Sequence, residues 1–422
     1  MPAPDARTIG LGFGAFMFAA LNGAVAAQAM KLPNAKVEPL SFAALDGWQD
    51  DDHAEAFGAF MKSCGAIQHG TKAMRAARPV YGALFKVCER AKAAGPLDRD
   101  QARAFFEENF RPVRVAPFGE TPQGFYTGYY ETEVHGSLVR TEEFNVPIYR
   151  KPDNLLMPKN GRGRPARIAG GKKIVPYHDR TEIEQGVLAG KGLEICWVKD
   201  PVDAFFAQIQ GSTRVKLNDG KLMRLNYHAH NGLPYTPVGR NLIDRGIISK
   251  EEMSMDRIRD WMRANPEEGR ALRRKNRSFV FFRETHLAAD EECIGAQGVP
   301  LTALRSVAVD RKIHVYGTPI WVDVDLPIES EVPDTKFRRL MVAQDTGSAI
   351  VGPARADIYF GSGEEIGSIA GRVKQFGQFV MLAPRNLAAG KGGGARTVPV
   401  PKPKPRSRDV VADAAVTSEP QP

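Results

Sequence analysis

The segment that decides the fold reads Arg339-Leu340-Met341-Val342-Ala343-Gln344-Asp345-Thr346-Gly347-Ser348-Ala349-Ile350-Val351-Gly352 and resumes as Arg355-Ala356-Asp357-Ile358-Tyr359-Phe360-Gly361. Its short apolar runs, bounded by glycine, are typical of β-strands. Asp345 and Asp357 interrupt these runs, although aspartate is depleted in strands and its charged form is costly to bury. The segment therefore predicts strands that carry two acids, each of which needs an explanation.

Two explanations are open for each acid. A buried carboxyl whose pKa is raised by desolvation stays protonated and can act as a general acid. Alternatively, the carboxylate oxygens accept backbone hydrogen bonds at a turn. The pattern supports both roles equally for Asp357. It favours the structural role for Asp345, because Thr346-Gly347-Ser348 is typical of a tight turn.

The run Asp345-Thr346-Gly347-Ser348 also matches the short signature of aspartic proteases. That chemistry needs two such aspartates that share one proton. The chain holds no second Asp-Thr-Gly or Asp-Ser-Gly copy, so a homodimer would have to supply it. A motif this short also recurs by chance, and this interpretation is the weaker one.

Length and periodicity place the segment in a larger body. The chain has 422 residues, of which 43% are hydrophobic, enough for two domains with buried cores. Helical periodicity covers residues 46–110, with Asp98 as a predicted N-cap. From Gly124 onward, short runs rich in aromatic and β-branched residues predict strands. We therefore expect a mainly β, α+β fold with a helical N-terminal lead-in.

The charge distribution argues against a nucleic-acid partner. The formal net charge is +9, but residues 391–408 alone carry six positive charges and no negative ones. The remaining body is only mildly basic, and it lacks a ribonucleoprotein motif and a helix-turn-helix pattern. The sequence indicates no metal and no other cofactor. A mildly basic body suits an anionic polymer such as a cell-wall strand.

The two ends of the chain have their own composition. Residues 9–27 are apolar and run into the small residues of Ala24-Val25-Ala26-Ala27-Gln28-Ala29, which is typical of a secretory signal peptide with its cleavage site. The alternative is an uncleaved membrane anchor. We expect residues 1–29 to direct the chain to the periplasm, at the wall or the outer membrane. Residues 389–422 are rich in Gly, Pro, Lys and Ala, so they are predicted to be disordered.

The chain has four cysteines, Cys64, Cys88, Cys196 and Cys293, an even number that permits disulfides in an exported protein. Cys64 and Cys88 fall in the helical region, and a bridge between two packed helices there is the favoured pairing. Free buried thiols are the alternative. The spacing predicts neither a zinc site nor a redox pair.

Seven motifs together carry a family resemblance. They are Thr127-Gly128-Tyr129-Tyr130-Glu131, Val175-Pro176-Tyr177, Gln208-Ile209-Gln210-Gly211-Ser212, Asn231-Gly232-Leu233-Pro234-Tyr235, Val238-Gly239-Arg240, Ser278-Phe279-Val280-Phe281-Phe282 and the block from Asp345 to Gly361. In this order they resemble the membrane-bound lytic murein transglycosylase A family, over roughly residues 120–385.

The resemblance implies a double-psi β-barrel domain with an inserted second β domain and a groove between the two. The implied boundaries are residues 40–130 for the lead-in and first part of the barrel, 131–278 for the inserted domain, and 279–388 for the barrel with the catalytic aspartate. The implied partner is the peptidoglycan strand. Its β-1,4 bond would be cut without water, leaving a 1,6-anhydro ring.

The resemblance also implies roles for individual residues. Asp357 matches the catalytic aspartate of the family, and Asp345 matches a second aspartate that supports it. Aromatic, amide and hydroxyl side chains suit sugar binding. The predicted substrate-binding set is Thr127, Gly128, Tyr129, Tyr130, Gln210, Gly211, Ser212, Tyr235, Gly239 and Arg240. For each of the aromatic, amide and hydroxyl candidates alone, core packing or a turn is an equally good explanation.

Two other functions stay open at this point. A hydrolase on a similar barrel would need a second carboxylate, for which Glu131 and Glu133 are the nearby candidates. An expansin-like wall-binding protein could keep the aspartate without cutting. The sequence departs from the family pattern at Ser348, beside the site, and at His228 and His230. An exposed polar face is the favoured explanation of these histidines over a metal pair.

Overall fold

A computed structural model describes residues 31–387, apart from residues 120, 159–163, 171, 251, 289–290 and 348. The predicted signal or anchor segment and the predicted disordered tail lie outside the described residues. Within the described part of the chain, no helix is both long and apolar enough to cross a membrane.

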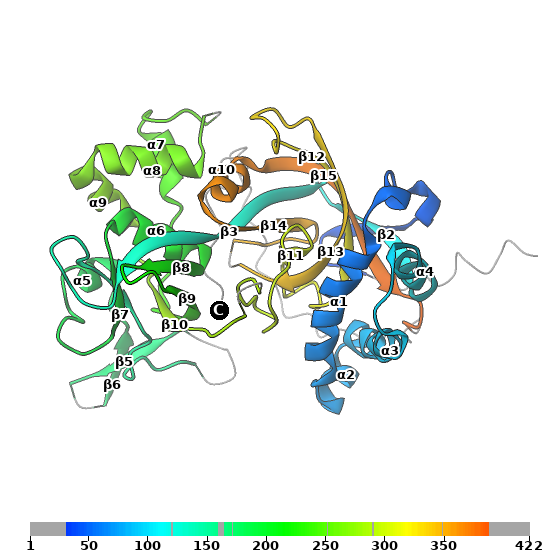
Figure 1. The fold of residues 1–422 in the computed structure, drawn as a ribbon, viewed down its shortest axis with the longest axis horizontal. Coiled ribbons are helices and arrows are strands. Elements are labelled where there is room, and N and C mark those ends of the chain that lie inside the picture. The colour runs from blue at the N-terminus through cyan, green and yellow to red at the C-terminus, as the bar shows by residue number, and fades with distance from the viewer. Residues whose placement is uncertain are drawn as a thin grey trace, which may run out of the picture.

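The helical lead-in packs against one side of the strands that follow. It comprises α1 (His53–Gln68), α2 (Lys72–Ala77), α3 (Pro79–Ala94) and α4 (Arg99–Asn109), preceded by β1 (Ala35–Pro39). Asp98 caps α4 in a capping box with Gln101, as the sequence predicted. Phe60 and Phe106 of this layer join Trp321 and Leu340 of the sheet in one buried cluster. The helices thus cover one flank of the barrel at the right of Figure 1.

Six strands close into a barrel. They are β3 (Gly124–Ser137), β11 (Ser306–Val309), β12 (Pro319–Leu326), β13 (Thr335–Asp345), β14 (Arg355–Ser362) and β15 (Lys374–Pro384). The pairing runs β3–β15–β12–β13–β11–β14 and returns from β14 to β3, so each of the six strands has two neighbours in the ring. β2 (Phe110–Pro117) adds to β15, and β1 adds to β2. α10 (Glu364–Arg372) connects β14 to β15.

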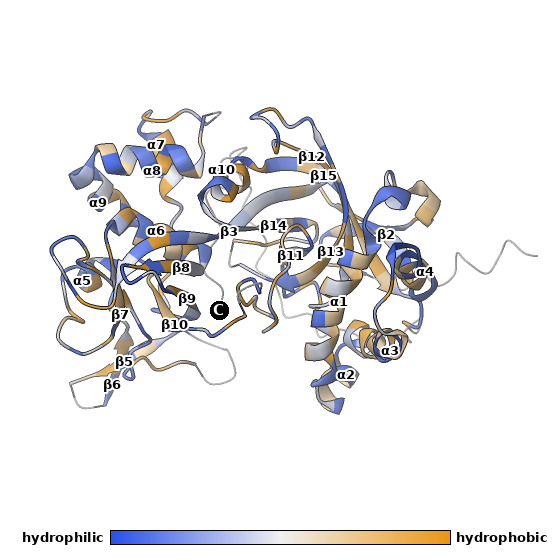
Figure 2. Cartoon of the chain, viewed as in Figure 1, coloured by the Kyte–Doolittle hydropathy of each residue, from blue (hydrophilic) through white to orange (hydrophobic). Residues whose placement is uncertain are grey.

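Alternation along these strands builds the core. Inward residues such as Tyr126, Val307 and Ile358 belong to the largest buried apolar cluster. The residues between them point outward, as expected for a period of two. Figure 2 shows hydrophobic residues along the barrel strands and on α3.

The second domain is a smaller sheet with helices. Its strands are β4 (Val146–Tyr149), β7 (Glu194–Val198), β8 (Ser212–Leu217), β9 (Leu222–His230) and β10 (Val280–Glu284), with a separate hairpin of β5 (Ala166–Ala169) and β6 (Lys173–Pro176). Its helices are α5 (Arg180–Glu184), α6 (Pro201–Gln210), α7 (Val238–Asp244), α8 (Met255–Ala264) and α9 (Pro266–Lys275). β10 pairs with β9 in this sheet, whereas the predicted boundary at residue 279 assigned it to the barrel.

One long strand belongs to both sheets. The first half of β3 pairs with β14 and β15 in the barrel, and residues 132–137 pair with β8 and β7 in the second domain. Figure 1 shows β3 running from the centre of the molecule into the second domain. The predicted mainly β fold, with a barrel and a second β domain, is confirmed.

Candidate active site

The two aspartates flank a single residue of the strand between them. Ala308 on β11 pairs with Asp345 on β13 and, on its other side, with Asp357 on β14. Thr127 on β3 is the next residue in this row, as the partner of Asp357. Paired residues point to the same face, and strands lie about 4.8 Å apart, so the two aspartate Cα atoms are about 10 Å apart on one face.

A β-bulge turns Asp345 toward this face. Along β13, Ala343 pairs with Val307 of β11. The next pair joins Asp345 to Ala308, so Gln344 lies outside the ladder. One extra residue reverses the face to which the following residues point. The bulge therefore directs Asp345 outward, although Ala343, two residues earlier, packs in the barrel core.

Asp357 is buried beside a hydroxyl and a guanidinium. The residue is only 2% exposed. Its Oδ1 accepts a hydrogen bond from Oγ1 of Thr127 at 2.5 Å, and Nη2 of Arg355 donates to the same Thr127 oxygen at 2.7 Å. Burial raises the pKa of Asp357, and the charge of Arg355 and the Thr127 hydroxyl partly oppose this rise. The carboxyl thus keeps its proton to a higher pH than an exposed aspartate does.

Asp345 is buried as well, and donors from two other segments hold it. Its Oδ2 accepts from the hydroxyl of Tyr129 at 2.7 Å, and its Oδ1 accepts from the backbone N–H of Ala296 at 2.7 Å. Burial and the nearby Asp345 raise the pKa of Tyr129 well above its ordinary value, so this phenol stays a donor. The supporting role of Asp345 toward Asp357 stays a prediction.

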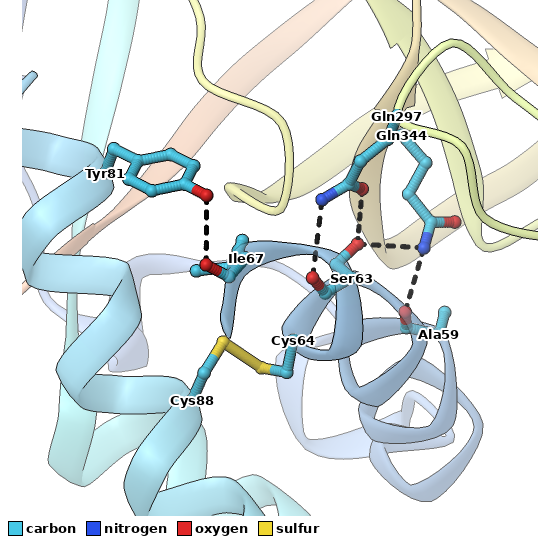
Figure 3. Close-up of a disulfide and its surroundings, with 8 residues drawn as sticks. All are labelled: Ala59, Ser63, Cys64, Ile67, Tyr81, Cys88, Gln297 and Gln344. Atoms are coloured by element: carbon cyan, nitrogen blue, oxygen red, sulfur yellow. Dashed lines mark hydrogen bonds between the residues drawn. A yellow bond between two sulfur atoms is a disulfide. The ribbon is translucent and has the colours of Figure 1, made fainter. Parts of the chain in front are cut away.

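The bulge residue is clamped to helix α1. The Nε2 of Gln344 donates to the carbonyl of Ala59 and to Oγ of Ser63, both at 2.9 Å. Ser63 in turn donates to Oε1 of Gln297 at 2.8 Å, next to the Ala296 amide that binds Asp345. Figure 3 shows Gln297 and Gln344 converging on this serine. Helix α1 therefore supports both sides of the Asp345 carboxyl.

A disulfide fixes the same helix from behind. Cys64, the residue after Ser63, is bonded to Cys88 of α3, which is the pairing that the sequence favoured. Figure 3 shows the bond beneath the turn that carries Ser63. Cys196 and Cys293 are free and buried. The covalent link therefore lies next to the hydrogen bonds that hold the bulge.

A charged network extends from this row into the second domain. The hydroxyl of Tyr359 donates to Oε2 of Glu292 at 2.9 Å, and Arg214 binds the same oxygen at 2.8 Å. Arg214 also binds Oε2 of Glu131 at 2.7 Å, with Arg224 at 3.4 Å. Burial raises the pKa of Glu131, opposed by the hydrogen bond and charge of Arg214. Glu131 is thus an ion-paired acid on the same strand as Thr127.

The four predicted substrate-binding residues on β3 have different environments. Thr127 and Tyr129 contact the two aspartates directly. At Gly128 a Cβ atom would lie 2.8 Å from the backbone oxygen of Ala370 on α10, so this glycine permits close helix packing. The hydroxyl of Tyr130 accepts from Nη2 of Arg259 at 2.9 Å. Substrate contact at these positions stays a prediction.

The residues predicted from α6 and β8 lie where the second domain meets β3. The Oε1 of Gln210 accepts from the backbone N–H of Tyr130 at 3.3 Å. Gly211 ends α6 in the left-handed region, with φ of 82°, and Ser212 begins β8. Gln210 and Ser212 are buried at this junction, and substrate contact by them stays a prediction.

The remaining predicted residues lie on or before α7. Tyr235 packs against the largest buried cluster, Gly239 is buried, and Nε of Arg240 lies 3.4 Å from Asp244. His228 is exposed, while Nδ1 of His230 accepts from the backbone N–H of Gly232. In the part of the chain that the structure describes, no group of three His, Cys, Asp or Glu residues could hold a metal. Ser348 lies outside the described residues.

Sequence reasoning gave no role to Arg355 or Glu292. Arg355 stands two residues before Asp357, and this spacing places both side chains on one face of a strand. The strand alternation could therefore have identified Arg355 as a neighbour of Asp357. Glu292 lies in a segment without strand or helix periodicity, so only the folded chain brings it to Tyr359. Arg355 brings its own positive charge to Thr127, the partner of Asp357, and Glu292 links Tyr359 to the positive charge of Arg214.

Comparison with known proteins agrees with this architecture. Residues 125–283 match the MltA specific insert domain, and residues 305–383 match the 3D domain. The membrane-bound lytic murein transglycosylase A of Escherichia coli K12 is 36% identical over 260 residues, which are 61% of this chain and 65% of that protein. The chain thus spans just under two thirds of that relative.

Solved structures resemble the chain over most of their length. A membrane-bound lytic murein transglycosylase from Agrobacterium tumefaciens is 36% identical, with a TM-score of 0.72 over 83% of this chain and 98% of that one. E. coli MltA with bound chitohexaose is 31% identical, with a TM-score of 0.58 over 84% and 93%. With these similarities in sequence and in fold, the chain belongs to the membrane-bound lytic murein transglycosylase A family.

Proposed function

We propose that the chain is a lytic transglycosylase that cleaves the β-1,4 bond between N-acetylmuramic acid and N-acetylglucosamine in peptidoglycan. The observation that carries this proposal is the environment of Asp357. The carboxyl is buried, its pKa is raised by that burial, and its hydrogen bond comes from a hydroxyl. A carboxyl of this kind is suited to give a proton to a leaving oxygen and to take one back.

One carboxyl suffices when the sugar supplies its own nucleophile. In the first step Asp357 protonates the glycosidic oxygen as the bond to C1 breaks, and the carboxylate remains. In the second step the C6 hydroxyl of the same muramic acid forms the bond to C1, and its proton returns to Asp357. The product carries a 1,6-anhydro ring, no water is consumed, and the carboxyl ends in its starting form.

Thr127, Arg355 and Asp345 would support this cycle. When Asp357 is ionised, the Thr127 hydroxyl still donates a hydrogen bond to it. Arg355 donates to the same hydroxyl oxygen, so its positive charge lies close to the carboxylate. Asp345 accepts hydrogen bonds from Tyr129 and Ala296, and it would line the same face of the barrel on the other side of Ala308 from Asp357. We propose that glycan lies along this face. Chitohexaose, which E. coli MltA binds, has the same type of backbone.

The two acids that a hydrolase would need are already bound to cations. Glu131 pairs with Arg214 and Arg224, and Glu133 pairs with Lys216 at 2.5 Å. A carboxylate held in this way is poorly placed to activate water. These pairs favour the lytic reaction. For the location, we propose the periplasm, with residues 1–29 as signal peptide or anchor.

The test is a digest of purified sacculi, with products analysed by mass. The wild-type chain should release anhydro-ended fragments, and Asp357→Asn should reduce their rate by about 100-fold or more. Asp310→Asn is the matched control, because Asp310 is also buried in the barrel domain but accepts backbone N–H groups of Lys312 and Gly352. Reducing ends would indicate a hydrolase, and no cleavage a binding protein. A folded Asp357→Asn protein with parental activity would remove the proposed mechanism.

A further inference from the structure

A cavity of about 550 Å³ lies within the second domain. Residues of β4, α5, β7, α6 and α9 line it. Figure 1 shows α5, α9 and β7 at the left end of the molecule, while β13 and β14, which carry the aspartates, lie at its centre. The volume falls in the range of sites for small organic ligands.

The charges around this cavity do not balance. Five arginines line it, against two glutamates: Arg140, Arg180, Arg270, Arg273 and Arg274, with Glu184 and Glu194. Glu184 is shared, because it lies 3.7 Å from Nη1 of Arg180 and 3.0 Å from Nε of Arg274. The excess positive charge indicates that the cavity is built for an anion.

Arg273 is a buried arginine of this cavity with an incomplete set of hydrogen bonds. The residue is 5% exposed, and its Nε has no hydrogen-bond partner among the described residues. Burial lowers its pKa, helped by the charges of Arg270 and Arg274, and the charges of Glu184 and Asp200 oppose this only in part. A buried guanidinium with an unpartnered N–H is costly, and the surrounding arginines outnumber the acids, so a ligand carboxylate or phosphate would complete the site.

The other walls of the cavity are aromatic. Tyr149, Trp197, Phe205 and Phe279 line it together with the arginines. Burial raises the pKa of Tyr149 to about 12, so its hydroxyl remains a donor. Tyr149, Phe205 and Phe279 are at most 5% exposed, whereas Trp197 is partly exposed and leaves an aromatic surface for a ligand. The cavity therefore suits a ligand that joins an acidic group to an organic body.

The proposed substrate contains such a ligand. The N-acetylglucosamine unit is uncharged, whereas the peptide stems attached to the muramic acid carry free carboxylates. We propose that this cavity binds a carboxylate of a wall stem peptide, as a second recognition site of the insert domain. The inference rests on the proposed function for its choice of ligand.

The binding experiment needs no catalysis. Stem peptide released from sacculi by an amidase is titrated into the full chain by calorimetry, beside the same peptide with its carboxylates converted to amides. Arg270→Glu is the test variant, because Arg270 is half-exposed and, in the part of the chain that the structure describes, forms an ion pair with Glu267 of its own helix. Arg103→Glu is the matched control, since Arg103 pairs in the same i,i+3 manner with Asp100 on α4.

We expect the acidic peptide to bind, the amidated peptide not to bind, and Arg270→Glu to weaken binding about 10-fold, as loss of one charge-assisted hydrogen bond would. Equal affinity in Arg270→Glu and Arg103→Glu would overturn the proposal. So would equal binding of the amidated peptide, or full displacement by equimolar inorganic phosphate. Anhydro products from naked glycan strands, with no peptide binding, would refute this inference alone. Peptide binding without anhydro products would refute the proposed function alone.

Discussion

The buried carboxyls of Asp357 and Glu131 both lie at strand β3, but different groups bind them. Asp357 lies beside Thr127 of β3, bonded to a hydroxyl, with Arg355 one hydrogen bond farther away. Glu131, four residues along β3, is bonded directly to Arg214. Burial raises the pKa of both groups. A cation that is bonded directly to a carboxylate fixes it in a structural role. A hydroxyl partner leaves the carboxyl able to exchange its proton.

Replacing Glu131 should have the largest effect on stability. Glu131→Gln removes the buried anion that Arg214 and Arg224 share and leaves Arg214 with Glu292 alone, so we expect a loss of about 3–5 kcal/mol in the free energy of unfolding. Glu133→Gln, two residues farther on, breaks a more exposed pair and should cost under about 1 kcal/mol. Denaturant unfolding compares the two variants, and similar losses would contradict the structural role given to Glu131.

The disulfide should come next. Cys64 and Cys88 are 24 residues apart, and a loop of this size corresponds to about 3 kcal/mol of stability. Because Ser63 clamps the bulge that aims Asp345, the double change Cys64→Ser/Cys88→Ser should also lower the cleavage rate. The melting temperature of the wild type should fall with reductant, and that of the variant should not respond. A wild type that ignores complete reduction would contradict this account.

Removing the Thr127 hydroxyl should have the smallest effect, visible as a pH shift. This hydroxyl lowers the pKa of Asp357 against the rise caused by burial, so Thr127→Val should raise that pKa further. The acid form then survives to higher pH, and the alkaline limb of the rate profile should move up by about 0.5–1 pH unit. Thr127→Ser should restore the wild-type profile.

The raised pKa of Asp357 also makes the free energy of unfolding depend on pH, in a defined direction. A carboxyl whose folded pKa is raised contributes stability that is fully present below its unfolded value near 3.8 and is lost as pH rises toward the folded value. In Thr127→Val that loss should extend to higher pH, and Asp357→Asn should abolish it. Unfolding free energies between pH 3 and 7 test this, and an unchanged pH dependence in Asp357→Asn would contradict it.

Several elements followed from local pattern alone. The cap at Asp98, the helices before residue 110 and the strands around Asp345 and Asp357 are fixed by short-range preferences and by alternation, which act within a few residues. The second domain was harder to delimit. The boundary at residue 279 that the resemblance implied puts β10 with the barrel, and only the pairing of β10 with β9 assigns it to the other sheet.

The sequence by itself determined that two acids stand in buried strands, that cysteines lie in the helical layer, and that ordered motifs resemble one family. The tertiary structure alone decided which groups meet those acids. A single bulge at Gln344 sets the face of Asp345, and Arg355 reaches Asp357 through a hydroxyl of a strand more than two hundred residues earlier. Side-chain direction and long-range pairing depend on register, and register is a property of the closed barrel and of no single segment.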